Sequence, residues 1–343
     1  MIEVQDLVRR YGAYTAVDHL SFSVQKGEIC GFLGPNGAGK STTMNMMTGY
    51  LGITEGDCVI DGHSITAQPR QVRRLIGYLP EQPPLYTDMT PLEYLSFAAE
   101  LRGLARDERG GAVADAIRLT ALGDMRGRLI SKLSKGYRQR VGLAQAILGF
   151  PPILIFDEPT VGLDPKQIIE IRELIRTLAR EHTIILSSHI LSEVRELCGR
   201  VLIISHGRLM ADGSPEELER RADTGALELT VRTDDPARAA ELLSALPGLS
   251  SCHMDEADNP REAALTLVPE PGLDLREALF ALCVRENLPI LTLKNKSESL
   301  ERIFIKLTEG EPAPAENAAE EFEETVDPEE TEETEAADDE SNL

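Results

Sequence analysis

The nine residues Gly34–Thr42 read GPNGAGKST and fit the phosphate-binding pattern G-x-x-x-x-G-K-[ST], with a third glycine inside it. The apolar stretch 28–33 before them is predicted to be a short buried strand. The stretch from Lys40 to Thr48 contains no helix breaker and is predicted to be a helix. A strand, a glycine-rich turn and a helix are the context in which this pattern holds phosphate groups.

Each residue type in this loop has a chemical task. Glycines let successive backbone N–H groups point at phosphate oxygens, and the start of the following helix adds its free N–H groups and its dipole. Lys40 brings a mobile positive charge to the β and γ phosphates, and the Ser41 hydroxyl is suited to Mg²⁺. We therefore expect a nucleoside triphosphate to be bound by Gly34, Pro35, Asn36, Gly37, Ala38, Gly39, Lys40, Ser41 and Thr42.

Length and charge limit the possible classes of protein. The chain has 343 residues and is 42% hydrophobic, which predicts two folded domains with sizeable cores. The net charge is −23, but residues 309–343 contain 16 acidic and no basic side chains, which leaves −7 on the rest. Such an acidic protein is not expected to bind nucleic acid.

Neither a membrane span nor a secretory leader is predicted. No apolar run approaches the roughly 18 residues that a membrane helix needs, and the N-terminal residues MIEVQDLVRRYG lack an apolar core. The five cysteines are scattered and show no metal-binding spacing. We expect reduced, buried thiols, with no disulfide and no zinc.

The first 222 residues alternate strand-like and helix-like segments, which predicts an α/β fold. Buried strands are expected at 153–156, 183–186 and 201–204, and a helix at 165–180. Ser214-Pro215-Glu216-Glu217 has the form of a capping box with proline at the first helical position, so a helix is expected to close this unit.

A different pattern follows a predicted hinge at 223–225. Residues 226–307 read as strand, helix, two strands, helix and strand, followed by a final helix at 297–307. This order predicts a small α+β domain of the ferredoxin-like type. The segment 308–343, rich in Glu, Ala, Thr and Pro, is expected to be a disordered acidic tail.

Asp157 and Glu158 directly follow the apolar run 153–156. Such a run places Asp157 at the carboxyl edge of a parallel sheet, where α/β proteins bind their ligands. Asp157 is suited to hold Mg²⁺ through water, and Glu158 to polarise a water that attacks the γ phosphate.

A third segment, LSKGYRQR at 133–140, precedes an unbroken helical stretch. Ser134 is a good helix cap, and the helix start together with the N–H of Gly136 could bind an anion. Taken alone, this segment predicts only a capped helix.

The segments GPNGAGKST, LSKGYRQR, ILIFDEPTVGLDP and SSHILSE occur in that order. Over residues 1–220 the chain resembles the nucleotide-binding subunit of an ATP-binding cassette (ABC) transporter. The resemblance implies a P-loop NTPase domain over 1–222 with a helical subdomain at about 81–150. It also implies ATP and Mg²⁺ as the ligands.

The resemblance also assigns roles beyond the loop. Tyr11 would stack on the adenine ring, and His189 would reach the γ phosphate as a catalytic residue with Glu158 and Lys40. Ser134 and Gly136 would contact ATP held by a second subunit, and Asp164 would shape the contact between the two subunits.

Two segments depart from the family pattern. The usual signature is LSGGQ, whereas this chain has LSKGY, a variant similar to that of a branch of export-type cassettes. The usual glutamine after GYLP is replaced by Glu81, followed by Gln82. Either could ligate Mg²⁺ and sense the membrane partner; we favour Glu81 because a carboxylate is the stronger ligand for a hard cation.

We therefore expect an ATPase motor, peripheral on the cytoplasmic face of the membrane, that drives a separate permease with several membrane spans, for export. Its second ATP-binding subunit would be another copy or a paralogue. The alternative is an ABC ATPase that acts without a permease, as in translation or DNA repair, although this chain contains one phosphate loop and no long coiled coil. In a third possibility the domain at 226–306 senses a ligand.

Overall fold

The computed structural model describes residues 1–222, 225–257, 259–296 and 299–308. The acidic tail predicted at 308–343 falls, from residue 309 onward, outside this range. The hinge predicted at 223–225 likewise lies outside the described residues except for Gly225.

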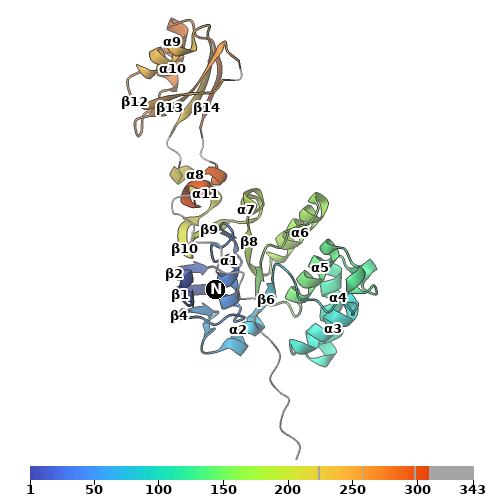
Figure 1. The fold of residues 1–343 in the computed structure, drawn as a ribbon. Coiled ribbons are helices and arrows are strands. Elements are labelled where there is room, and N and C mark those ends of the chain that lie inside the picture. The colour runs from blue at the N-terminus through green and yellow to red at the C-terminus, as the bar shows by residue number, and fades with distance from the viewer. Residues whose placement is uncertain (223–224, 258, 297–298, 309–343) are drawn as a thin grey trace, which may run out of the picture. The chain divides into compact units, whose positions relative to one another are not determined.

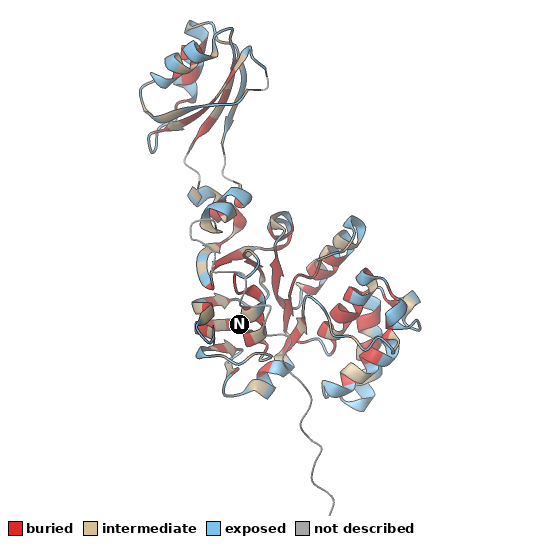
Figure 2. Cartoon of the chain, viewed as in Figure 1, coloured by how far each residue is buried: buried red, intermediate tan, exposed pale blue. Residues whose placement is uncertain are grey.

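The core of the first domain is a six-stranded sheet in the order β10-β9-β3-β8-β7-β6. The strand bounds are β3 (Ile29–Leu33), β6 (Ile76–Leu79), β7 (Ile153–Phe156), β8 (Thr183–Ser188), β9 (Arg200–Ser205) and β10 (Arg208–Gly213). All neighbouring strands are parallel except β10 and β9, which are antiparallel. Figure 2 shows that β3, β7, β8 and β9 consist mostly of buried residues, which explains their largely apolar sequences. The predicted α/β fold is confirmed.

A second, antiparallel sheet packs beside the phosphate loop, in the order β2-β1-β4-β5. Its bounds are β1 (Ile2–Tyr11), β2 (Tyr14–Val24), β4 (Glu55–Ile60) and β5 (His63–Ser64). Its buried side chains share one apolar cluster with Met44, Met46 and Met47 of helix α1 (Lys40–Met47). The start of β2 is thereby held against the phosphate loop.

Some helices lie against the sheets, whereas α3, α4 and α5 form a separate group beside the central sheet (Figure 1). Their bounds are α2 (Pro69–Leu75), α3 (Pro91–Leu101), α4 (Arg106–Leu119), η1 (Gly123–Met125), η2 (Ile130–Lys132), α5 (Lys135–Ile147), α6 (Pro165–Leu178), α7 (Leu191–Leu197) and α8 (Pro215–Ala222). Helices α3, α4 and α5 contact one another within the segment expected to form the helical subdomain. The capping box of α8 is confirmed: Glu217 N donates to Ser214 Oγ at 3.1 Å, and Ser214 N donates to Glu217 Oε2 at 3.2 Å.

Residues 227–295 form a small sheet with two helices, in the strand and helix order predicted for a ferredoxin-like unit. The bounds are β11 (Leu227–Arg232), α9 (Pro236–Ser244), β12 (Leu249–Asp255), β13 (Glu262–Pro269), α10 (Arg276–Arg285) and β14 (Ile290–Asn295). The four strands are antiparallel in the order β12-β13-β11-β14. Helix α10 begins at Arg276, where the Asp274 side chain accepts a hydrogen bond from Arg276 N at 3.0 Å within a turn.

The final helix, α11 (Leu300–Thr308), packs with the first domain rather than with this small sheet. Leu300 and Ile303 join the apolar cluster that contains Leu218 of α8. Leu300 N donates to Glu219 Oε1 at 3.3 Å, and Glu219 also pairs with Arg195 of α7 at 3.1 Å. Chain segments on both sides of the small sheet are therefore anchored on the same domain.

The five cysteines are free thiols, and burial raises the pKa of Cys30 and of Cys58 to about 12. Because the thiolate is the reactive form, we expect a short treatment of the folded protein with iodoacetamide at pH 8 to label only Cys252, the one cysteine that is not fully buried. Mass spectrometry of the alkylated peptides measures this, with urea-unfolded protein as the control in which all five react. Labelling of Cys30 at the rate of Cys252 would contradict the structure.

Candidate active site

The phosphate loop connects the end of β3 to the start of α1, and its glycines stand where side chains do not fit. A Cβ on Gly34 would lie 2.5 Å from the carbonyl oxygen of Ile204, and one on Gly39 would lie 2.5 Å from that of Ala16. Gly39 has φ +97°, in the region that favours glycine. The loop is thus packed between β9 and the start of β2, which holds its backbone N–H groups in place.

Lys40 is the first residue of α1, and its side chain folds back into the loop. Its ammonium donates to the carbonyl oxygens of Gly34 at 2.7 Å and Pro35 at 3.1 Å, and the residue is 7% exposed. Burial lowers the pKa of Lys40, while the carboxylates of Glu158, Asp157 and Glu81 act in the opposite direction. Two separate segments, one with Glu81 and one with Asp157 and Glu158, therefore bring acidic groups to the neighbourhood of this cation.

Replacing single glycines separates loop strain from steric conflict. Gly37→Ala introduces a side chain at φ +77° where no atom lies within 4 Å, so we expect a loss of about 1 kcal/mol in unfolding free energy. Gly39→Ala adds the conflict with Ala16, so we expect a further loss of about 1–3 kcal/mol and a clear loss of ATP affinity. Urea unfolding followed by circular dichroism, with ATP titration, measures both. Equal effects of the two variants would contradict this packing.

The predicted carboxylate pair lies at the carboxyl end of β7, next to the end of β8. Ser187 on β8 links its two members: Ser187 Oγ donates to Asp157 Oδ1 at 2.6 Å and accepts from Glu158 N at 2.8 Å. Asp157 is 2% exposed and Glu158 7% exposed. The two acids are consequently held in fixed positions before any ligand binds.

Glu158 and His189 form the second half of the site. Nδ1 of His189 lies 2.8 Å from Glu158 Oε2, and the imidazole is half exposed. Glu158 has φ +47°, an uncommon backbone conformation for a residue that is not glycine. Such strain is typical of functional sites, and the strained residue is the one whose side chain contacts His189.

The acidic groups near Lys40 are of the chemical kind that Mg²⁺ takes as ligands. Mg²⁺ takes oxygen ligands, is usually held by one or two carboxylates together with phosphate oxygens, and keeps several waters. The buried carboxylate of Asp157, the hydroxyl of Ser41 and the exposed carboxylate of Glu81 are the oxygen donors that the sequence indicates for it. The buried Lys40 supplies the cation that a phosphate chain requires.

Ser134 and Gly136, the residues of the signature segment LSKGY, lie beside the start of α6. Ser134 is the N-cap of α5 and accepts from Tyr137 N at 3.4 Å. A Cβ on Gly136 would lie 2.4 Å from Oε1 of Gln167, and Gln167 N donates to Asp164 Oδ1, which caps α6, at 2.9 Å. The structure therefore brings Ser134 and Gly136 together with Asp164.

Sequence reasoning missed two residues that order this site. Ser187 carries the link between the carboxylates, and its place at the end of a buried strand is the signal that could have indicated it. Glu193 on α7 is 2% exposed, accepts from Thr160 Oγ1 at 2.7 Å and from Ser188 Oγ at 3.3 Å, and thus joins the segments that lead to Asp164 and His189. A buried acid four residues after His189 was its signal.

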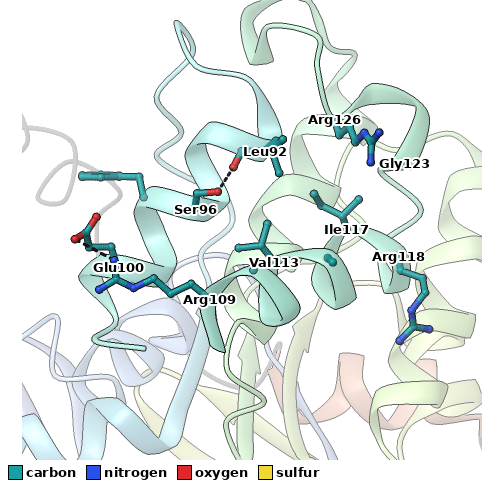
Figure 3. A pocket seen from close by; sticks show the side chains of 12 residues that line it. Leu92, Ser96, Glu100, Arg109, Val113, Ile117, Arg118, Gly123 and Arg126 are labelled. Atoms are coloured by element: carbon teal, nitrogen blue, oxygen red, sulfur yellow. Dashed lines mark hydrogen bonds and ion pairs between the residues drawn. The ribbon is translucent and has the colours of Figure 1, made fainter. Parts of the chain in front are cut away.

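The helical group carries a surface pocket of about 730 Å³ between α3, α4 and the residues after them (Figure 3). Its floor is apolar, with Val113 and Ile117, and charged side chains stand at its rim. The rim residues include Arg118, Arg126, and Glu100, which pairs with Arg109 at 3.0 Å.

A phosphate loop, a buried carboxylate pair and a parallel sheet define a P-loop nucleoside triphosphatase. Residues 17–161 match the family described as ABC transporter. The chain is 34% identical to the bacitracin transport ATP-binding protein BcrA of Bacillus licheniformis, covering 90% of this chain and 98% of that protein. It is also 34% identical to the daunorubicin/doxorubicin resistance ATP-binding protein DrrA of Streptomyces peucetius, covering 93% and 96%.

The fold is likewise similar to that of a solved bacterial ABC transporter cassette, MJ0796, described as dimeric. The TM-score is 0.58 and the identity 25%, over 62% of this chain and 98% of that one. The chain belongs to the family of ABC transporter ATP-binding subunits. It is an ATPase, the motor subunit of such a transporter. Among the described residues, no helix is long and apolar enough to cross a membrane.

Proposed function

We propose that this chain hydrolyses ATP in a closed dimer and thereby drives export through a separate membrane permease. The observation that carries the proposal is the contact between Glu158 and His189, placed beside the buried Lys40 of the phosphate loop. The names of two relatives support this proposal, because BcrA is named for bacitracin transport and DrrA for daunorubicin/doxorubicin resistance.

The chain's own residues divide the chemistry among them. The loop amides and Lys40 bind the phosphates, and Asp157 with Ser41 and Glu81 would hold Mg²⁺, which supplies charge neutralisation at the phosphates when bound. Glu158 accepts a proton from the attacking water, and its bond to His189 orients both groups. The His189 face that is exposed is available for the γ phosphate.

A second subunit would complete the site. Ser134 and Gly136 lie at the start of α5, where free N–H groups favour an anion, and they stand beside Asp164. We assign these three residues to the contact with the second ATP-binding subunit, either a copy of this chain or a paralogue. Tyr11, which is 41% exposed at the β1–β2 turn, would receive the adenine ring.

The pocket in the helical group is the surface that we assign to the permease. It combines an apolar floor with charged groups at its rim, the composition of a transient interface. The pocket lies in the segment that joins Glu81 to Ser134. A movement of the permease against this surface would therefore displace both Glu81 and Ser134, the residues that we place at bound nucleotides.

The test uses the full chain purified from its native membranes after mild crosslinking. We expect one multi-span membrane protein to accompany it, and ATPase activity that Lys40→Met abolishes. Retention of the same partner by the Lys40→Met variant separates binding from turnover. Recovery of an active ATPase without any membrane protein would favour the alternative that acts without a permease.

A further inference from the structure

We propose that Arg9 is a positioning residue for the nucleotide base, acting through Tyr11. The inference rests on the proposed function, because it takes Tyr11 to be the platform on which adenine stacks. Arg9 lies outside the phosphate loop and outside the four motifs on which the family resemblance was based.

The guanidinium of Arg9 covers one face of the Tyr11 ring. Its central carbon lies 4.5 Å from the ring centroid, within the range of a cation–π contact. Since Tyr11 is 41% exposed, its ring remains accessible for a base. A base stacked on the free face would complete a sandwich of guanidinium, phenol ring and purine.

Arg9 is itself anchored to the region behind the phosphate loop. Its Nη1 donates to the carbonyl oxygen of Gly52 at 2.9 Å, in the turn that follows α1. The neighbouring Arg10 N donates to Thr54 Oγ1 at 3.2 Å, and Thr54 N to Val8 O at 2.9 Å. The end of β1 is thus tied to the segment leaving the phosphate-binding helix.

One feature of Arg9 is unfavourable for stability alone. Its Nε is buried and has no hydrogen-bond partner in the part of the chain that the structure describes. A buried donor without a partner costs free energy, so this arrangement favours a role other than simple packing. Fixing the Tyr11 ring before the base arrives is such a role, because less side-chain freedom is then lost on binding.

The experiment measures the affinity of the full chain for two probes by calorimetry, the non-hydrolysable analogue AMP-PNP and inorganic tripolyphosphate, both with Mg²⁺. Arg9→Met keeps the apolar stem and removes the guanidinium. We expect AMP-PNP affinity to fall by about two- to fivefold, as for the loss of one exposed cation–π contact. Tripolyphosphate affinity should not change, since this probe has no base.

The matched control is Arg10→Met, which removes the same charge one residue away. Arg10 pairs with Glu55 at the surface, whereas the guanidinium that lies over the Tyr11 ring is that of Arg9. This variant is expected to leave both affinities unchanged. In a Tyr11→Ala background, Arg9→Met should have no further effect on AMP-PNP, because the platform through which it acts is gone.

Four outcomes overturn the inference alone: equal loss of affinity for both probes, no loss for AMP-PNP, an equal loss in Arg10→Met, or additivity with Tyr11→Ala. If Arg9→Met does not fold, Arg9→Gln, whose amide can still donate to Gly52, carries the same test. If the wild type binds neither probe, the proposed function fails, and the inference that rests on it fails too.

Discussion

Glu158→Gln is expected to bind ATP like the wild type and to hydrolyse it at least about 100-fold more slowly, the range typical of a lost general base. Glutamine has nearly the same shape as glutamate, and the backbone contact of residue 158 with Ser187 Oγ at 2.8 Å does not involve the side chain. Its amide can also still meet His189. The phosphate loop and Lys40 are unaffected, so binding should persist.

The same variant should accumulate as a dimer when ATP is added, because hydrolysis is the step that releases the two subunits. Light scattering coupled to size-exclusion chromatography measures the mass with and without ATP. The control is Glu216→Gln, an exposed residue in the first turn of α8, which should hydrolyse ATP normally and show no trapped dimer. Normal turnover by Glu158→Gln would show that another group activates the water.

The local part of the site could be predicted because each piece is a continuous segment. Gly34–Thr42 needs only the adjacent strand and helix to take its shape, and Asp157 needs only the apolar run before it. Four strands of the central sheet, β3, β7, β8 and β9, were predictable for the same reason, since burial on both faces requires unbroken apolar sequence. The topology of the small domain followed from the order of its elements.

Contacts between distant segments could not be predicted in this way. Ser187 donates to Asp157 from the neighbouring strand, although the two residues are 30 positions apart in the sequence. Neither segment contains a sequence pattern that indicates this pairing. Arg9 reaches Gly52 over 43 residues. Helix α11 directly follows the small sheet in sequence but packs with α8, because the two helices bury their apolar faces against each other.

Helix amphipathicity was predicted in outline but not residue by residue. Of the apolar positions on α6, Ile171, Leu174, Ile175 and Leu178 are buried, whereas Ile169 is 60% exposed. The helix also ends at Leu178, two residues earlier than the predicted end at 180. A periodic pattern identifies the face that a helix buries, but the width of that face depends on the neighbour that covers it.

Glu193→Ala is expected to lower the free energy of unfolding by about 3–5 kcal/mol, the cost of removing one partner from a buried ion pair. Glu193 Oε1 lies 3.2 Å from Arg172 Nη2 without forming a hydrogen bond, while Oε2 accepts from Thr160 at 2.7 Å and from Ser188 at 3.3 Å. The substitution removes all these contacts at once and leaves two hydroxyls and a guanidinium without this acceptor.

The matched control is Glu196→Ala, three residues along the same helix. Glu196 pairs with Arg172 at 2.6 Å and with Arg176 at 2.7 Å, but its side chain is 47% exposed. Solvent screens such pairs, so this variant should lose only about 0–1 kcal/mol. Each substitution thus removes one carboxylate that pairs with Arg172. The carboxylate of Glu193 is buried, whereas that of Glu196 is at the surface.

Circular dichroism in urea is the suitable measurement, because the chain contains no tryptophan to serve as a fluorescent probe. Hydrogen exchange at the amides of α7 distinguishes loss of the first domain from separate unfolding of the small sheet. Because Thr160 and Ser188 lie next to the segments that carry Asp164 and His189, ATP turnover of Glu193→Ala should also fall well below that of Glu196→Ala. If the two variants lose equal stability and equal turnover, Glu193 does not hold these segments together, and the order of the site must come from Ser187 and the strand ends alone.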